Sequence, residues 1–282
     1  METVNLIGID IGGTKINACR IESNKIANQV LVQTPAKEPE EVVLKSLSDS
    51  VEKLINKDVK GIGVGVPGMV DPEHGIVKQV QNIPSWKEVP LKKYLENKFQ
   101  IPVFVNNDAN CFAAGEKYFG YGKKFHHFLG ITLGTGLGGG IIIHDSLYNG
   151  LSTGAGEVGY LPYKDSIFEH YCSSQFFSHF YQTTGLAVHK RVIQGDKDAQ
   201  KIMDEFGFHL GELIKNICTI LAPEAIIFGG SISKSFHSFE KSMMENVQTF
   251  SFPSVIKNLK IIPSNINDIA VLGAAALYYD SL

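Results

Sequence analysis

Apolar residues fall into two patterns along this chain. Continuous apolar runs predict short buried strands at 6–11, 61–66, 102–105, 129–133 and 223–228. Apolar residues at helical spacing predict helices at 41–57, 91–99, 168–181, 204–221 and 270–279. Strands that alternate with helices in this way are typical of an α/β fold with a mixed sheet, in which ligands bind beyond the carboxyl ends of the strands.

Two of the predicted strands end in similar glycine-rich turns. The first leads into Gly12-Gly13-Thr14-Lys15 and the second into the turn at 134–140. Apolar return strands follow at 16–21 and 141–144, so each strand and turn begins a hairpin and the fold unit is present twice. Because the composition shows no linker, this repeat defines the domain boundary, which we place after Asp108. The expected domains are residues 1–108 with 268–282 and residues 109–267.

Length and composition restrict the class of protein. A chain of 282 residues is long enough for two domains with buried cores. The net charge of −3, the pI of about 6.3 and the lack of a long run of Lys and Arg argue against nucleic acid as a partner. No apolar stretch of about 18 residues occurs, so we expect a cytoplasmic protein without a membrane partner. The four cysteines are far apart and predict neither a disulfide framework nor a cysteine zinc cluster: Cys19, Cys111, Cys172 and Cys218.

The glycine turns have the chemistry of a phosphate site. Glycine lets backbone N–H groups approach phosphate oxygens with no β-carbon in the way, so two turns are able to hold one polyphosphate from opposite sides. Thr14 and Thr135 occupy comparable turn positions and add hydroxyl donors. The Asp10 carboxylate is a candidate to hold a Mg²⁺ ion that bridges phosphates, and Lys15 adds a positive charge. The alternative interpretation is an ordinary Gly-Gly hairpin with a solvated lysine.

Further polar residues are candidates to bind a second substrate. Asp108 follows a predicted strand, and its carboxylate can act as a general base for a hydroxyl group that attacks a γ-phosphoryl group. The competing interpretation is a helix N-cap, which the local sequence alone favours. Asn82, Asn107, Glu157 and Glu169 are able to hydrogen-bond to hydroxyl groups of a polyol, although exposed glutamates often bind nothing.

Six short motifs occur in order over nearly the whole chain: Asp10-Ile11-Gly12-Gly13-Thr14-Lys15, Gly65-Val66-Pro67-Gly68, Asn107-Asp108-Ala109-Asn110, 134–140, Gly156-Glu157-Val158-Gly159 and Phe228-Gly229-Gly230. In this combination and order the chain resembles the ROK family of sugar kinases and repressors. The resemblance implies the actin-like ATPase architecture, an α/β fold of two ribonuclease-H-like domains that flank a cleft.

The resemblance also implies a role for each motif. Asp10 would place a Mg²⁺ ion carried by the nucleotide, and Asp108 would be the catalytic base. Gly229 and Gly230 would lie near the adenosine end of ATP. The residues that would hold the phosphates are Gly12, Gly13, Thr14, Lys15, Gly134, Thr135 and Gly136. The residues that would contact the sugar are Gly68, Asn82, Asn107, Asp108, Glu157 and Glu169.

The chain departs from the family pattern at one place. Many members carry a histidine directly after the Glu-x-Gly segment, followed by a zinc loop with three cysteines. In this chain Tyr160 replaces that histidine, and the loop is shortened to residues 161–167, without cysteine. We therefore expect no structural zinc. Because the family histidine also touches the sugar, the wall of the site that faces the substrate is expected to differ, and the identity of the sugar stays open.

The resemblance predicts an enzyme that uses ATP and Mg²⁺ to phosphorylate a hydroxyl, at C6, of a hexose or an N-acetylhexosamine. Glucose is the first expectation, and polyphosphate is an open alternative to ATP. A non-catalytic sugar-binding protein or a sugar-responsive regulator is the alternative class. Family repressors carry an additional N-terminal DNA-binding region, whereas here the first motif begins within the first ten residues, which disfavours that class. A homodimer is an open expectation, because family members are often dimers.

Overall fold

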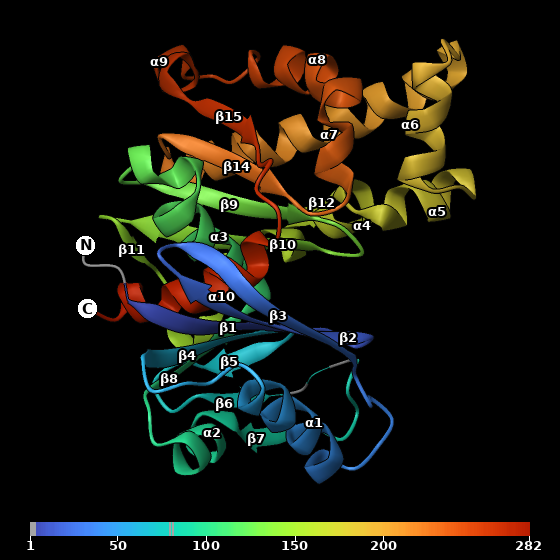
Figure 1. Cartoon of the computed structure of the whole chain (residues 1–282). Coiled ribbons are helices and arrows are strands. Elements are labelled where there is room, and N and C mark those ends of the chain that lie inside the picture. Colours follow the sequence, from blue (N-terminus) through green and yellow to red (C-terminus); the bar gives the residue numbers. More distant parts are fainter. Residues whose placement is uncertain (1–3, 79, 81) are drawn as a thin grey trace. The chain divides into compact units, whose positions relative to one another are not determined.

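The computed structural model describes residues 4–78, 80 and 82–282, and its contacts divide the chain into two compact units (Figure 1). Unit 1 consists of Met1–Lys124, Gly140–Ala155 and Ile266–Leu282, and unit 2 of Phe125–Gly139 and Gly156–Asn265. These bounds differ from a division after residue 108, because the helix that follows Asp108 packs against the C-terminal helix inside unit 1. No helix in the described part of the chain combines the length and the apolar character that crossing a membrane requires.

Unit 1 is built on a five-stranded sheet with the order β3-β2-β1-β4-β8. Its strands are β1 (Asn5–Ile11), β2 (Lys15–Glu22), β3 (Lys25–Gln33), β4 (Val59–Val66) and β8 (Val103–Asn107). The first three strands are antiparallel, and β1, β4 and β8 are parallel. The predicted hairpin and the predicted strands at 61–66 and 102–105 are confirmed. The sequence pattern did not predict β3, because its side chains are exposed or only partly buried and its apolar run, at 30–32, is only three residues long.

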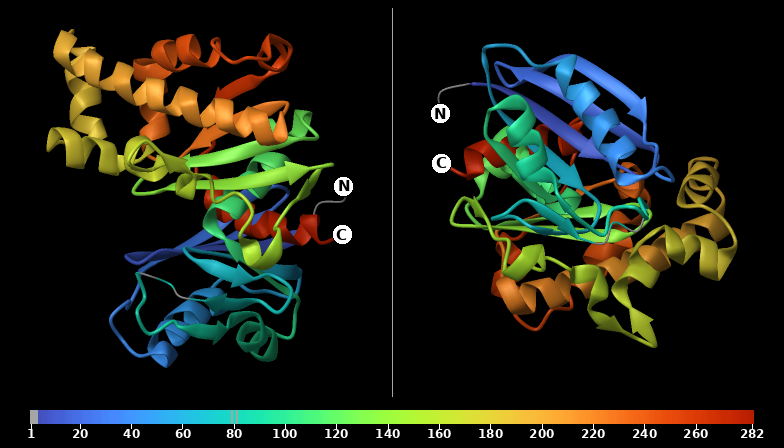
Figure 2. Two further views of the ribbon diagram at one scale, coloured as in Figure 1. Left: turned by 180° about the vertical axis from the view of Figure 1, so that it is seen from behind. Right: turned by 90° about the horizontal axis from the view of Figure 1, so that it is seen from below.

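Different helices cover the two faces of this sheet (Figures 1 and 2). On one face Ile7 and Ile9 join a core with α1 (Glu40–Glu52) and α2 (Leu91–Phe99). On the other face α10 (Ile269–Asp280) packs directly on the backbone of β1 and β4. A β-carbon on Gly8 would lie 2.1 Å from the Val271 carbonyl oxygen, and one on Gly63 would lie 1.7 Å from that of Ala274. Glycine is therefore required where the helix backbone approaches the sheet.

Smaller elements complete unit 1. A three-stranded antiparallel sheet is formed by β5 (Met69–Asp71), β6 (Ile76–Lys78) and β7 (Glu88–Pro90). Helix α3 (Asp108–Phe119) crosses α10 closely, and the 3₁₀ turn η1 (Tyr121–Lys124) follows it. The unit also contains the C-terminal part of β10 (Leu137–Ile143), with β11 (Ser146–Leu147) and η2 (Leu151–Thr153).

The second sheet repeats the topology of the first, with the order β11-β10-β9-β14-β15. Three of its strands lie in unit 2 and are parallel: β9 (Phe128–Leu133), β14 (Ala225–Gly229) and β15 (Lys260–Pro263). The central strand is β1 in the first sheet and β9 in the second. On one side of it lies the next strand of the chain, β2 or β10, and on the other side lie two parallel strands. The fold class implied by the resemblance, mixed α/β with two ribonuclease-H-like domains, is thus confirmed.

Helices make up most of the rest of unit 2 (Figure 1). They are α4 (Phe168–Cys172), α5 (Ser174–Tyr181), α6 (Gly185–Ile193), α7 (Lys197–Leu221), α8 (Phe236–Val247) and α9 (Pro253–Asn258), with the 3₁₀ turns η3 (Val158–Tyr160) and η4 (Ile232–Ser235). The helix predicted at 204–221 begins earlier, because the Asp196 side chain accepts hydrogen bonds from the first backbone N–H groups of α7. The helical pattern at 168–181 is divided at Ser173, whose extended backbone ends α4 and whose hydroxyl caps α5.

Candidate active site

The polar residues of unit 1 lie in one row across neighbouring strands. Asp10 on β1 pairs with Gly65 on β4, and Gly65 pairs with Asn106 on β8. Because the three strands are parallel, their carboxyl ends meet at one edge of the sheet. The turn after β1, the turn at Gly68 after β4 and the start of α3 at Asp108 all follow from this edge.

The first glycine turn is closed by backbone hydrogen bonds. The Gly12 N–H donates to the Lys15 carbonyl oxygen at 2.8 Å, and the Thr34 hydroxyl donates to the Gly12 carbonyl oxygen at 2.6 Å. A β-carbon on Gly13 would lie 2.5 Å from the Asn82 β-carbon. The chain therefore requires glycine at position 13 in order to bring Asn82 against the turn, whereas the Thr14 and Lys15 side chains are exposed to solvent.

Asp108 is exposed at the first position of α3, and Asn107 caps this helix. The Asn107 side-chain oxygen accepts from the Ala109 N–H at 2.9 Å, and its amide donates to the Gly68 carbonyl oxygen at 2.9 Å. The Asp108 carboxylate also accepts from the Ala109 N–H. The competing interpretation of Asp108 as the N-cap is therefore wrong, because the preceding residue occupies that position with its side chain.

The Cys111 thiol interacts electrostatically with both acidic residues at this sheet edge, Asp10 and Asp108. A β-carbon on Gly65 would lie 3.1 Å from the Cys111 sulfur. Burial, and then the Asp108 and Asp10 carboxylates, raise the pKa of this thiol far above its usual value. Burial also raises the pKa of the Asp10 carboxyl, and Lys15 partly offsets that effect. Asp10 is thus a desolvated acid that a cation would stabilise.

The second glycine turn, in unit 2, is held by residues from α4 and α5. The Leu137 N–H donates to Glu169 Oε2 at 3.0 Å, and the Ser174 N–H donates to the Gly134 carbonyl oxygen at 2.9 Å. A β-carbon on Gly136 would lie 2.7 Å from Glu169 Oε2. A β-carbon on Gly134, in contrast, would meet no heavy atom of the described residues within 4 Å, so the packing around this position leaves room for a side chain.

The third glycine turn lies beside the second. Gly229, the last residue of β14, pairs with Thr132 on β9, and β9 ends one residue later. Gly230 has a φ of +86°, and a β-carbon on it would lie 2.3 Å from the Leu133 carbonyl oxygen. Only glycine accommodates both the left-handed backbone and this close approach. The turns at 134–136 and 229–230 thus leave the same edge of two parallel strands.

Glu157 and Glu169 are close enough to interact electrostatically. Although Glu157 is exposed as a residue, partial burial of its carboxyl group and the negative charge of Glu169 raise its pKa. Glu169 Oε1 accepts a hydrogen bond from the Gln175 side chain at 3.0 Å, in addition to the bond of its other oxygen with Leu137. Glu169 therefore supports the glycine turn, a contact that the sequence pattern did not predict because it depends on tertiary packing.

The short segment in place of the family zinc loop forms a hairpin of β12 (Pro162–Tyr163) and β13 (Ser166–Ile167). The Tyr163 ring stacks on Phe168 at 4.2 Å, and its hydroxyl is hydrogen-bonded to His209 Nδ1 at 2.9 Å. Burial lowers the pKa of His209 to about 4, so it is neutral near pH 7. Tyr160, which replaces the family histidine, is 60% exposed. Within the described ranges no group of three or more His, Cys, Asp or Glu side chains is arranged to hold a metal ion.

The structure gathers the predicted site residues into one set in each unit. The set of unit 1 is Asp10, Gly12, Gly13, Thr14, Lys15, Gly68, Asn82, Asn107 and Asp108. The set of unit 2 is Gly134, Thr135, Gly136, Glu157, Glu169, Gly229 and Gly230. No sequence motif indicated the contacts that Cys111, Ser174 and Gln175 make at these sites, because none of them belongs to a glycine or acidic motif.

Duplicated sheets with glycine turns at their carboxyl edges are the architecture of the actin-like ATPase class, to which the structural neighbours also belong. The profile of the ROK family matches residues 6–281, and the chain belongs to that family.

Relatives with two kinds of function are similar to this chain. A glucokinase of Thermotoga maritima is 28% identical over 98% of each chain. A xylose repressor of Caldicellulosiruptor bescii is 29% identical over 97% of this chain and 77% of its own length. A ROK family glucokinase from Streptomyces griseus, solved in complex with glucose and AMPPNP, is 27% identical, with a TM-score of 0.79 over 97% of this chain and 98% of that chain.

Proposed function

We propose that this protein transfers the γ-phosphoryl group of ATP to a hydroxyl, at C6, of a hexose or an N-acetylhexosamine, with Asp108 as the general base. The observation that carries the proposal is the position of Asp108. Its carboxylate is exposed at the carboxyl end of β8, on the same sheet edge as the glycine turn after β1, while Asn107 provides the helix cap. A solvent-exposed carboxylate at this sheet edge has the chemistry to accept a proton from a substrate hydroxyl.

The other predicted site residues have groups that suit ATP, the donor, and the sugar, the acceptor. Phosphoryl transfer depends mostly on positioning and electrostatic stabilisation, so rigid turns with backbone N–H groups suit the donor. The turns at 12–15 and 134–136 are fixed by hydrogen bonds within their own units, and Gly134 leaves room beside the second turn. For the sugar, Asn82, Asn107, Glu157 and Glu169 offer both donors and acceptors to hydroxyl groups.

The Mg²⁺ ion would enter with the nucleotide. Mg²⁺ is commonly held by one or two carboxylates together with substrate phosphates, and the half-buried Asp10, with its raised pKa, is an acid of that kind. When bound, the ion neutralises charge on the phosphates. Asp10 would hold it from the side of the protein, and Lys15 adds a second positive charge near the first glycine turn.

The test is an ADP-release assay with Mg·ATP over glucose, mannose, fructose, N-acetylglucosamine and N-acetylmannosamine. We expect turnover with at least one of these sugars, glucose first, and phosphorus NMR of the product identifies the hydroxyl that is phosphorylated. The same sugars with polyphosphate in place of ATP test the choice of donor. Absence of turnover with every sugar and both donors would contradict the proposal.

A sugar-responsive regulator is the second candidate, because a xylose repressor has an identity to this chain similar to that of the glucokinase. This candidate predicts that a sugar binds without turnover. Calorimetric titration of the same sugars, without nucleotide, distinguishes a silent binding protein from a protein that binds no sugar.

A further inference from the structure

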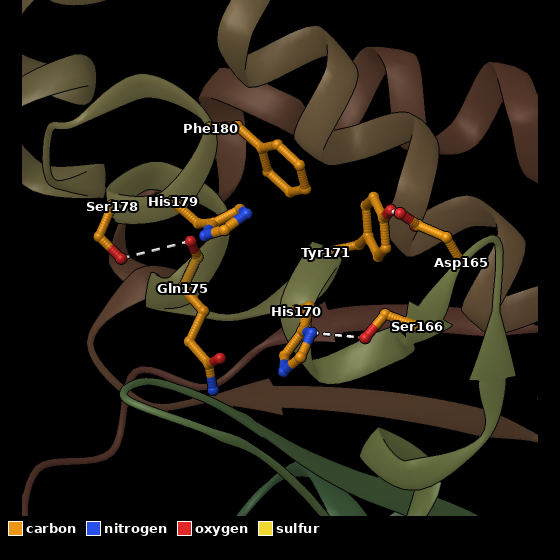
Figure 3. A pocket seen from close by; sticks show the side chains of 8 residues that line it. All are labelled: Asp165, Ser166, His170, Tyr171, Gln175, Ser178, His179 and Phe180. Atoms are coloured by element: carbon orange, nitrogen blue, oxygen red, sulfur yellow. Dashed lines mark hydrogen bonds between the residues drawn. The ribbon is translucent and has the colours of Figure 1, made fainter.

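Unit 2 contains a cavity of about 550 Å³ that is separate from the glycine turns (Figure 3). Its walls come from α4, α5 and the turn between β12 and β13. The residues that line it are Asp165, Ser166, His170, Tyr171, Gln175, Ser178, His179 and Phe180. The volume is in the range of sites that bind small organic molecules. The hairpin that replaces the family zinc loop supplies two of these residues, so the cavity is built where this chain departs from the family pattern.

The lining combines aromatic faces with groups that both donate and accept hydrogen bonds. The Tyr171 and Phe180 rings are stacked at 5.3 Å, and His179 contacts Phe180 edge to face at 5.0 Å. Figure 3 shows these rings and the His170 and Gln175 side chains around the open space. Aromatic rings pack on the C–H faces of a pyranose, while imidazole, amide, hydroxyl and carboxylate groups hydrogen-bond to its hydroxyls.

The charge of the lining favours a neutral ligand over an anion. Asp165 contributes a carboxylate, and neither Lys nor Arg is among the lining residues named above. The nearby Lys164 ammonium lies 5.0 Å from the centre of the Tyr171 ring. A phosphate or carboxylate ligand in the cavity would face the Asp165 carboxylate, which is unfavourable.

One side chain connects the cavity to the predicted sugar site. Gln175 lines the cavity, and its amide nitrogen donates to Glu169 Oε1 at 3.0 Å. Glu169 is one of the residues proposed to contact the phosphorylated sugar. The Gln175 side chain therefore contacts both the cavity and that carboxylate.

We propose that this cavity is a subsite for a second pyranose ring, so that the substrate is a hexose that carries a glycosyl substituent. The proposal rests on the proposed function in one respect, the contact of Glu169 with the first ring. The phosphorylated hydroxyl belongs to the first ring, and the second ring lies against Tyr171, Phe180 and His170.

The experiment compares each disaccharide with the methyl glycoside of the same anomeric configuration: cellobiose with methyl β-glucoside, and maltose with methyl α-glucoside. We expect kcat/KM for at least one disaccharide to exceed that of its methyl glycoside by about tenfold or more. Ser178→Trp fills the cavity from α5 and should return that ratio to about one, with kcat/KM for glucose changed by less than about twofold. Ser254→Trp is the matched control, because Ser254 is an exposed helical serine outside the cavity and its replacement should change neither value.

A second variant and a binding measurement keep the test independent of folding and of turnover. His170→Ala removes part of the wall without adding bulk and should lower the disaccharide preference about threefold or more. Calorimetric titration of cellobiose and maltose reports binding even if no sugar is phosphorylated, and loss of that binding in Ser178→Trp would support the subsite while the kinase proposal fails. A disaccharide ratio near one in the unmodified protein, or tighter binding of inorganic phosphate than of either disaccharide, would overturn the inference.

Discussion

At the scale of single residues, the proposed chemistry depends on one carboxylate. Asp108→Asn keeps the shape of the side chain but cannot accept a proton. We expect kcat to fall by about 10²- to 10⁴-fold with little change in the affinity for sugar. Asp198→Asn is the control, because Asp198 is an exposed acid in the first turn of α7 and should leave kcat unchanged. Near-normal turnover of the Asp108 variant would exclude it as the base.

Alanine substitutions at two glycines distinguish a glycine required by the fold from a glycine required for ligand binding. Gly13→Ala forces a β-carbon against Asn82, so we expect a loss of about 1–3 kcal/mol in the free energy of unfolding. The β-carbon that Gly134→Ala adds would lie within 4 Å of no heavy atom of the described residues, so the free energy of unfolding should be unchanged or higher by about 0.5 kcal/mol. If the second turn holds phosphate, the same Gly134 variant should raise KM for ATP about tenfold or more. Urea unfolding and steady-state kinetics measure both effects, and an unchanged KM for ATP would contradict the assigned role.

The raised pKa of the Glu157 carboxyl predicts that the stability of the protein depends on pH. Its pKa is raised in the folded protein, by partial burial and by Glu169, so its contribution to stability is fully present below the unfolded pKa and is lost as the pH rises through the folded value. Glu157→Gln removes the unfavourable charge. The variant should therefore be more stable than the unmodified protein at pH 7, by about 0.5 kcal/mol or less because the residue is exposed, and this gain should disappear below about pH 4. Melting temperatures over pH 4–8 test the sign, and a gain that persists at pH 4 would refute the electrostatic explanation.

At the scale of elements, the start of α3 links the helix to the turn after β4. Asn107 caps the helix through its oxygen and binds the Gly68 carbonyl through its nitrogen. Asn107→Ala should cost about 1–2 kcal/mol, because it removes both bonds. Asn107→Ser keeps a capping oxygen and should recover about half of the loss or more. Chemical unfolding of the three proteins distinguishes these outcomes, and equal stability of the Ala and Ser variants would show that capping contributes little here.

Aromatic packing and a hydrogen bond hold the hairpin of β12 and β13, which lacks the cysteines of the family zinc loop. Stacking of Tyr163 on Phe168 and its hydrogen bond with a neutral, buried His209 tie the hairpin to α7. Aromatic contacts of this kind bury a large apolar area and fix ring orientation. They explain how a segment of seven residues without cysteine holds its position next to α4, which carries Glu169.

At the scale of the whole molecule, removal of metal ions tests whether a metal is needed for catalysis, for folding or for both. We expect dialysis against EDTA to abolish phosphorylation, because Mg²⁺ accompanies ATP, and addition of Mg²⁺ to restore it. The melting temperature should be unchanged by EDTA, because the expected fold needs no structural zinc. Differential scanning calorimetry before and after dialysis is the measurement. A lower melting temperature that Zn²⁺ restores would contradict the expected absence of a structural metal.

The sequence by itself determined the repeat and supplied the candidate residues for the proposed chemistry. Apolar runs and the turns that follow them predicted the hairpin of β1 and β2 and the strands β4, β8, β9 and β14, because strand periodicity and turn residues are local properties. The same patterns missed β3 and β15, whose side chains are partly exposed and carry no strong apolar signal.

Only the tertiary structure decided which candidates share an environment. It placed the cap on Asn107 instead of Asp108, put Cys111 beside two carboxylates, and tied Glu169 to the second glycine turn. It also formed the cavity around Tyr171 and Gln175. The contact of Glu169 with Leu137 and the interaction of Cys111 with Asp10 join positions far apart in the sequence, so the packing of elements, and not a local pattern, determines them.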